Sequence, residues 1–461
     1  MQLTGALFLF LFFPLSFLAV LPVPARARPI AFTLLSTLWY VLANLQNPWG
    51  IATVAALVLF AVLLSRNPYL QGNRVFLTLG VGVPLSIFVT ARILTEYTAL
   101  SVSYPVGLGF LALGAISLFV DCYRGDAQNG SAVETCAYLL FFPALCMGPV
   151  LRWKQFCAAP RTLAFSLPTF CLGIRLYMSG FIKRLVAAAM LFRATEQILR
   201  FEQTALPIVS LLFLLPFAYF FFYFFVSSGS DLARGVAAMY GVETPTDFAM
   251  LSHTAPDRML SGALLSLRAY LVDYVETPLV RICGRAGRFF APVCSVSLTL
   301  LFFRTRLELL LFALPLLLSA LLAPLSGKEE WRPRRRIWRL CLIALSSLLC
   351  SFLMLAMLFD TPAQSFSRFG APLSESLHFF YYMFGSVSST RYLLLGAILL
   401  ALYLTIVHVG PLASQRMSNK TRTVLSVAEW SLIFAGFVIA LLYFAPQFPH
   451  YANFAIPSLL T

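Results

Sequence analysis

Long apolar runs separated by short polar loops extend over most of the chain. An α-helix needs about 20 apolar residues to cross a bilayer, and runs of roughly that length recur from one end to the other. The pattern predicts helices over about 5–21, 30–45, 51–65, 75–92, 105–120, 134–151, 166–192, 205–226, 289–303, 307–324, 340–359, 391–409 and 424–445. This gives on the order of ten to thirteen full or partial crossings. We therefore expect an all-α, multi-pass transmembrane bundle.

Two segments interrupt this pattern. In 141–160, two prolines and a glycine break an apolar run, and basic residues follow at once. Residues 227–288 are less apolar, and their stretch 264–279 is amphipathic at helical spacing, which favours a position along an interface or beneath the bundle. Non-spanning backbone at membrane depth must be covered by protein or line a cavity. The sequence therefore predicts a central, half-buried funnel formed by 134–160 and 227–288.

Composition supports a membrane protein. The chain has 461 residues, 60% hydrophobic and 11% charged, with a mean hydropathy of +0.85. These values exclude an ordinary soluble domain and a disordered protein. We expect a single polytopic domain over 1–461, with a core at about 100–360 and peripheral spans at 1–99 and 361–461.

The net charge of +15 comes from 33 Lys and Arg against 18 Asp and Glu. Basic loops alternate with nearly uncharged ones, for example Arg66 and Arg74 after the uncharged 46–48, and 328–339 is the most basic loop. This alternation is typical of the positive-inside rule rather than of nucleic-acid binding. It predicts a cell-membrane protein with both termini outside.

Candidate chemistry is sparse. Nine cysteines are scattered without a CxxC pair, and no cluster has metal-ligand spacing, so we expect no metal site. There is no Walker A loop, GxGxxG, HExxH or GxSxG motif, and hence no signal for a bound cofactor.

Six stretches share, in order, motifs with one family. They are the N-terminal spans, 104–126 with Asp121 and Arg124, 138–156 with Arg152, 173–188, 225–235 with Ser227 and Asp231, and 266–279 with Ser266, Asp273 and Tyr274. In this order and spacing the chain resembles the membrane-bound O-acyltransferase family, in the bacterial branch of alginate O-acetylation and teichoic-acid D-alanyl transfer. The similarity runs over roughly residues 5–360.

The resemblance implies acyl transfer to a cell-envelope polysaccharide. It implies a donor such as acetyl-CoA or an acyl carrier, a glycan acceptor, membrane lipid around the bundle and an exported or periplasmic acyltransferase partner. The candidates for lining the cavity are Arg152, Lys154, Ser227, Asp231, Ser266, Asp273, Tyr274, Arg304 and Arg306.

One departure from the family affects the chemistry directly. The family's essential histidine lies in a segment that corresponds here to 297–318, which contains none, and a second family histidine corresponds to Leu264. A positioned imidazole base typically contributes 10²–10⁴-fold to such a reaction. Arg304 and Arg306 are always protonated and cannot replace it, although they could bind a phosphate or an oxyanion. Of the four histidines, His253 is the weak candidate for a relocated base.

Three functions therefore stay open. The chain is an active acyltransferase with a moved base, a non-catalytic scaffold or acyl or lipid conduit for a partner transferase, or a flippase or exporter of lipid-linked sugars. Some charged residues also have structural interpretations. We expect Lys183 and Arg184 to extend to the membrane interface, and Asp231 to pair with Arg234.

Overall fold

The structure is a computed structural model that describes residues 3–5, 7–24, 27–67, 72–97, 103–158, 166–199, 207–242, 244–248, 256–303, 308–322, 336–358, 369, 379 and 419–444. Over these ranges the chain forms helices and their connections, with no strand. The elements are η1 (Phe8–Phe12), α1 (Phe13–Val20), α2 (Arg28–Ala43), α3 (Pro48–Ser65), α4 (Arg74–Tyr97), α5 (Leu108–Arg124), α6 (Ala132–Leu139), α7 (Phe142–Met147), α8 (Trp153–Ala158), α9 (Leu167–Ile182), η3 (Lys183–Ala188), α10 (Ala189–Leu199), η4 (Ile208–Ser210), α11 (Leu211–Met239), α12 (Pro256–Ser261), α13 (Leu265–Leu271), η5 (Val272–Glu276), α14 (Thr277–Phe303), α15 (Glu308–Phe312), α16 (Leu314–Leu322), α17 (Arg336–Leu358), α21 (Asn419–Ile439) and η7 (Ala440–Phe444).

The all-α, multi-pass membrane fold is confirmed. Five helical stretches in the described part are long and apolar enough to cross a membrane: Pro48–Ser65, Arg74–Thr95, Ile208–Met239, Leu265–Phe303 and Cys341–Leu358. Shorter apolar helices, such as Arg28–Ala43, add to the bundle. The expected span at 391–409 lies outside the described residues.

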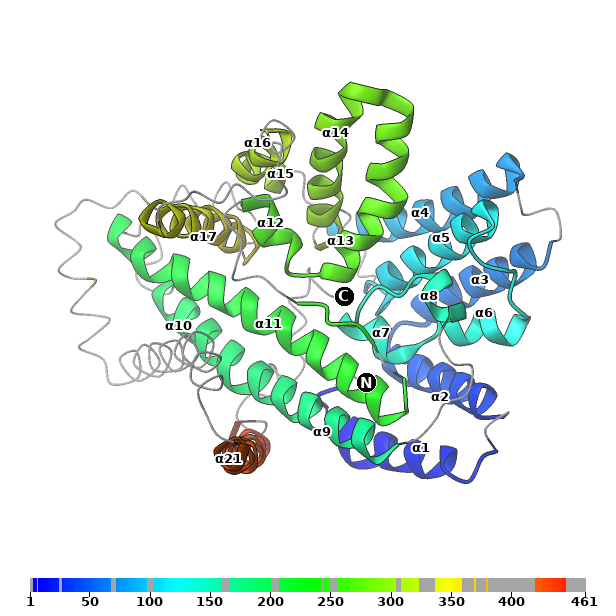
Figure 1. Ribbon diagram of the computed structural model, residues 1–461, viewed down its shortest axis with the longest axis horizontal. Helices are drawn as coiled ribbons and strands as arrows, with labels where there is room; N and C mark the ends of the chain where they lie inside the picture. The colour runs from blue at the N-terminus through cyan, green and yellow to red at the C-terminus, as the bar shows by residue number, and fades with distance from the viewer. Residues whose placement is uncertain are drawn as a thin grey trace.

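Helices α9 and α11 lie side by side at the centre of the bundle (Figure 1). Glycines allow their backbones to touch. A Cβ on Gly235 of α11 would lie 2.6 Å from the Tyr177 backbone nitrogen, and one on Gly180 of α9 would lie 2.9 Å from the Ser228 carbonyl oxygen. Small residues at the contact are the usual way for membrane helices to pack closely, because dispersion contacts are the main attraction available there.

The sequence prediction for residues 227–239 was wrong. We expected the span to end near 226 and a non-spanning segment to begin at 227, but α11 continues to Met239. The polar residues that suggested a break are small and buried: Ser228 and Ser230 are at most 1% exposed. Ser228 is tolerated in the helix because it lies at the close contact with α9 and its hydroxyl donates to the Phe225 carbonyl oxygen at 2.6 Å.

The predicted interruption at 141–160 is present. Helix α6 ends at Leu139, α7 is one short helix, and residues 148–152 are irregular before α8 begins. Gly148 is required here, since a Cβ would lie 2.6 Å from the Ala144 Cα and 3.1 Å from the Ala233 Cβ of α11. This irregular segment is therefore held directly against the central helix. The central funnel itself stays a prediction.

Candidate functional site

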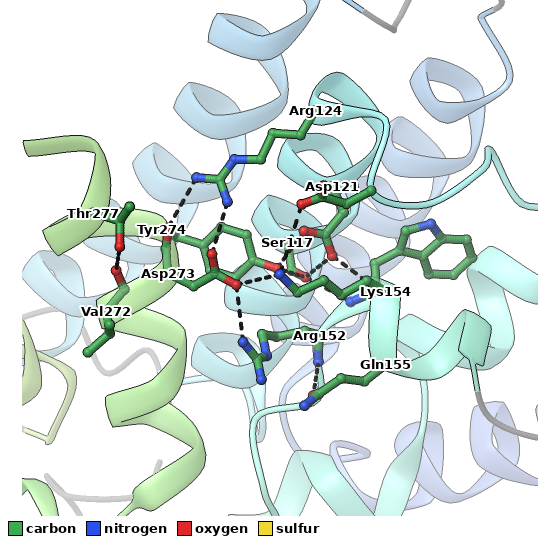
Figure 2. A network of polar contacts seen from close by, with 12 residues as sticks. Ser117, Asp121, Arg124, Arg152, Lys154, Gln155, Val272, Asp273, Tyr274 and Thr277 are labelled. Carbon is green, nitrogen blue, oxygen red and sulfur yellow. Dashed lines mark hydrogen bonds and ion pairs between the residues drawn. The ribbon is translucent and has the colours of Figure 1, made fainter. Parts of the chain in front are cut away.

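A single carboxylate, Asp273 on the π-helical turn η5, binds three cations from two other segments (Figure 2). Its Oδ1 lies 3.1 Å from Arg124 of α5, and its Oδ2 lies 3.1 Å from Arg152 and 2.5 Å from Lys154. Arg124 also donates to the Asp273 carbonyl oxygen at 3.1 Å. These residues are separated by about 120 to 150 positions in sequence, so the site exists only in the folded protein.

A second carboxylate, Asp121, lies beneath this ion-pair cluster and is fully buried. It accepts hydrogen bonds from the Lys154 backbone N–H at 2.9 Å and from the Tyr274 hydroxyl at 2.7 Å. Ser117, one turn earlier on α5, accepts from the Trp153 backbone N–H at 2.8 Å. Because buried polar groups are costly when unpaired, this lower layer fixes where α8 and η5 meet α5. We call the seven residues Ser117, Asp121, Arg124, Arg152, Lys154, Asp273 and Tyr274 the Asp273 network.

Local sequence explains the positions of the cations. Helix α5 ends at Arg124 because Gly125 takes the left-handed conformation, with φ +76°, that ends many helices. Arg152 lies just before α8, and its backbone N–H donates to the Gln155 side chain at 3.2 Å, which begins that helix. Both basic side chains therefore extend from helix ends toward the same turn of η5.

The Asp273 network is partly accessible, and its cations and acids are equal in number only when the adjacent Asp126 is included. Its three cations face Asp273, the buried Asp121 and, 3.9 Å from Lys154, Asp126. The Asp273 side chain is 25% exposed. Arginine binds carboxylate and phosphate with the same planar donor geometry. An anionic group that replaced the Asp273 carboxylate would therefore meet three cations already in place.

A second polar cluster lies between η3 and α11. Lys183 contacts Asp231 at 2.5 Å and Ser227 at 3.0 Å. Its neighbour Arg184 is 8% exposed and stacks 3.6 Å from the Phe225 ring centre. The interfacial positions expected for Lys183 and Arg184 were wrong, as was the pairing of Asp231 with Arg234. The π-turn η3 carries both basic side chains to the face of the helix that meets α11, and there α11 supplies an acid and an aromatic ring.

A third polar contact joins Ser266 to two other segments. The Ser266 hydroxyl accepts from the Val150 backbone N–H at 2.7 Å, and the Ser266 N–H donates to Asp247 Oδ1 at 2.6 Å. Asp247 is fully buried, and its second oxygen has no hydrogen-bond partner among the described residues. Burial raises the pKa of Asp247 to about 6, against the lowering effects of Ser266 and Arg234.

The predicted site residues thus divide into three groups. Arg152, Lys154, Asp273 and Tyr274 come together, Ser227 and Asp231 join Lys183, and Ser266 joins Val150 and Asp247. The remaining candidates, Arg304, Arg306 and His253, lie outside the described residues, as do His378, His408 and His450. The described part of the chain therefore holds no histidine.

The site list drawn from the sequence omitted some members. Asp121 and Arg124 belong to one of the six motif stretches and lie at the end of an apolar run. Charged residues in that position are a signal for a functional site, and this signal could have added both to the list. Lys183 was given a structural role because it lies near a span end. Asp247 has no sequence signal, since its burial depends on the distant Ser266.

Comparisons with known proteins show which sequences this chain resembles. No family model matches the chain. It is 26% identical over 326 residues to the probable alginate O-acetylase AlgI of Azotobacter vinelandii, a match that covers 65% of this chain and 63% of that protein. It is 27% identical over 257 residues to the protein of the same name from Pseudomonas fluorescens, covering 54% and 50% of the two chains, and 29% identical over 191 residues to that from Pseudomonas putida, covering 38% and 39%. The chain thus spans less than two thirds of the length of the curated relatives it matches.

The fold and the paired charges define a polytopic membrane protein with a built polar site. The similarity to several alginate O-acetylases confirms the particular resemblance drawn from the motifs, to the membrane-bound O-acyltransferase family in its alginate O-acetylation branch.

Proposed function

We propose that this protein transfers an acyl group, an acetyl group in the simplest case, to a cell-envelope polysaccharide. The observation that carries the proposal is the similarity to proteins named alginate O-acetylase over 326 residues. The structure adds physical support. Motif residues Asp121, Arg124, Arg152 and Asp273, which lie on three separate segments, meet in one network.

The Asp273 network suits the donor side of this reaction. Acetyl-CoA and the prosthetic groups of acyl carriers present phosphates, and Arg124, Arg152 and Lys154 are the groups that would bind them. Asp273 would hold the three cations in place until an anion arrives. The proposed setting is the inner membrane, with both termini outside, a glycan acceptor and an exported acyltransferase partner on the outer side.

The missing base leaves the scaffold as the competing function. Leu264, at the position of a family histidine, is 4% exposed and packs in the hydrophobic core. It cannot take a proton from an acceptor hydroxyl. A chain that binds the donor but lacks a base would act through a partner transferase.

The test uses the purified full chain in liposomes with radiolabelled acetyl-CoA and alginate oligosaccharides. Acetylated product and free CoA should form together. Arg152→Gln should reduce turnover by roughly tenfold or more, because it removes a cation that would bind the donor phosphate, and losing a charge-assisted interaction costs about 1.5–3 kcal/mol.

Arg175→Gln is the matched control. Arg175 pairs with Glu429 of α21 and is 38% exposed, away from the Asp273 network. Equal turnover by wild type and Arg152→Gln would contradict the role of the network. No turnover by wild type, with acetyl-CoA or with an acetylated acyl carrier, would contradict acyl transfer by this chain and favour the scaffold.

A further inference from the structure

Residues 272–303 form a helical hairpin that projects from the body of the protein (Figure 1). The turn is at Gly284, whose φ of 58° and ψ of −123° no helix contains. The two arms are in direct contact, since a Cβ on Gly287 would lie 2.6 Å from the Leu279 carbonyl oxygen. The two glycines therefore act differently in the hairpin. Gly284 reverses the chain and Gly287 lets the returning arm pass close to the first.

The hairpin tip is basic and apolar at once. Arg281, Arg285 and Arg288 are exposed, and no acidic residue occurs between 277 and 303. Close to them in sequence, Ile282 is 82% exposed and Phe290 is 62% exposed. Within the described residues no ion pair involves any of the three arginines. We call residues 281–290 the hairpin tip.

The base of the hairpin is fixed, in contrast to its tip. The first arm begins in the Asp273 network. The second arm ends where Phe303 packs against Phe222 of α11, with ring centres 5.5 Å apart, and where Arg92 donates to the Phe302 carbonyl oxygen at 3.2 Å. The tip, about 16 Å along the helix from Asp273, is thus presented by a rigid support.

We propose that the hairpin tip docks on the surface of an anionic bilayer, with its arginines on phospholipid phosphates and its apolar side chains inserted beside them. Three observations select this occupant. The exposed charge has one sign, guanidinium groups match phosphate geometry, and Ile282 and Phe290 are large exposed apolar groups, one on each arm of the hairpin. A soluble acidic protein would pair with the arginines but would not account for the exposure of these apolar side chains.

Docking would have a consequence for the Asp273 network. The arm that carries the tip also carries Asp273, so a tip bound at the membrane surface would restrain η5 against α5. The proposal stands apart from acyl transfer, because lipid binding at the tip requires no turnover.

The experiment uses the full chain with Cys283 as its only cysteine, labelled with a fluorophore. Cys283 is an exposed thiol within the hairpin tip. Two nanodisc preparations are compared. The nitroxide, near the headgroup end of an acyl chain, is carried by phosphatidylglycerol in one preparation and by phosphatidylcholine in the other. Each arginine at an anionic surface gives roughly a fivefold preference. We expect quenching by phosphatidylglycerol to exceed quenching by phosphatidylcholine by at least about fivefold at low salt, and the preference to fall in high salt.

In the double variant Arg285→Gln and Arg288→Gln, the quenching by phosphatidylglycerol should become nearly equal to the quenching by phosphatidylcholine. The matched control is Arg66→Gln combined with Arg74→Gln, which removes two other exposed arginines of the described chain and should keep the preference. Equal quenching by both lipids in the unmodified tip would overturn the proposal. Protection from both lipids together with quenching by aqueous iodide would also overturn it, and would point to a soluble partner. These two comparisons need no change to the arginines of the tip, only the single-cysteine chain, whose folding is checked by its thermal midpoint against that of wild type.

Discussion

Asp273 and Asp247 differ in how far the protein compensates the charge of an aspartate. Asp273 is partly exposed and has three cationic partners, so its charge is compensated where it stands. Asp247 is fully buried, and only one of its oxygens accepts a hydrogen bond, from the Ser266 N–H. A charge without sufficient partners in a dry environment raises the free energy of the folded state. Asp247 is therefore the residue at which pH should affect stability.

Stability should fall as pH rises through the pKa of Asp247. The group titrates at about 6 when folded, against 3.8 when exposed. Between these values the folded state binds the proton and the unfolded state does not, so the stabilising effect is complete below about 4 and lost above about 6. A shift of this size corresponds to about 3 kcal/mol at neutral pH.

Asp247→Asn removes this penalty and keeps an oxygen that can accept from Ser266. We expect the thermal midpoint of the purified variant to exceed that of wild type at pH 8, and the two midpoints to converge near pH 4. Asp126→Asn, at a 42% exposed side chain, is the control and should show no such difference. A constant difference across the pH range would mean that Asp247 does not titrate in this way.

At the scale of helices, backbone contact between α9 and α11 organises the bundle. Gly173 and Gly180 on α9 face Gly235 and Ser228 on α11, each pair seven residues apart. This spacing returns a helix to the same face after two turns, so the small residues form a continuous strip. The close approach also places Lys183, just after α9, within reach of Asp231.

Gly235→Ala should destabilise the protein although alanine favours helix formation. The added Cβ would lie 2.6 Å from the Tyr177 nitrogen, and neither backbone can yield without separating the helices. Overpacking of this kind costs about 1–3 kcal/mol. Gly82→Ala in α4 is the control, because nothing lies within 4 Å of its Cβ and the substitution should be neutral or slightly stabilising. The measurement is thermal unfolding in detergent, and equal midpoints for the two variants would contradict the packing argument.

The contact between α9 and α11 also shows what the sequence pattern could predict and what it could not. Apolar runs located some helices of the described chain, such as α3 and α17, to within a few residues, because burial in lipid or protein requires little more than hydrophobic length. The run ended too early at 226 because the pattern counts Ser228 and Asp231 as polar and takes no account of α9. The motif residues indicated Arg152 and Asp273 as site members. Their meeting with Asp121 depends on the folding of α8 and η5 onto α5, which no local pattern encodes.

In the described part of the chain, the loops at the two ends of α3 and α5 differ in charge. Arg66, Arg74 and Arg124 mark a basic end, and the loops 44–50 and 103–107 at the other end carry no formal charge of their own, with Arg92 of α4 against Tyr104. We call the second the uncharged end after these loops. The end with Arg66 and Arg74 also holds the Asp273 network, since the Gly72 N–H donates to the Tyr123 carbonyl oxygen at 3.3 Å, next to Arg124. At the other ends of α3 and α5, Asn47 donates to the Ser103 carbonyl oxygen at 2.5 Å. The positive-inside rule predicts a cytoplasmic position for the first end, in keeping with the proposed orientation. That side is where a soluble thioester donor would reach Arg124.

This polarity predicts which positions are open to reagents on each side of the membrane. Ser103→Cys and Gln128→Cys, each in a chain without other cysteines, place a thiol at an exposed position of the uncharged and the basic end, respectively. In intact cells a membrane-impermeant maleimide should label the first variant and spare the second, and permeabilised cells should label both. The reverse pattern would place the Asp273 network outside. In that orientation no phosphate of a cytoplasmic donor could reach its cations, and the donor-binding role would have to be abandoned even if the fold and its ion pairs stood unchanged.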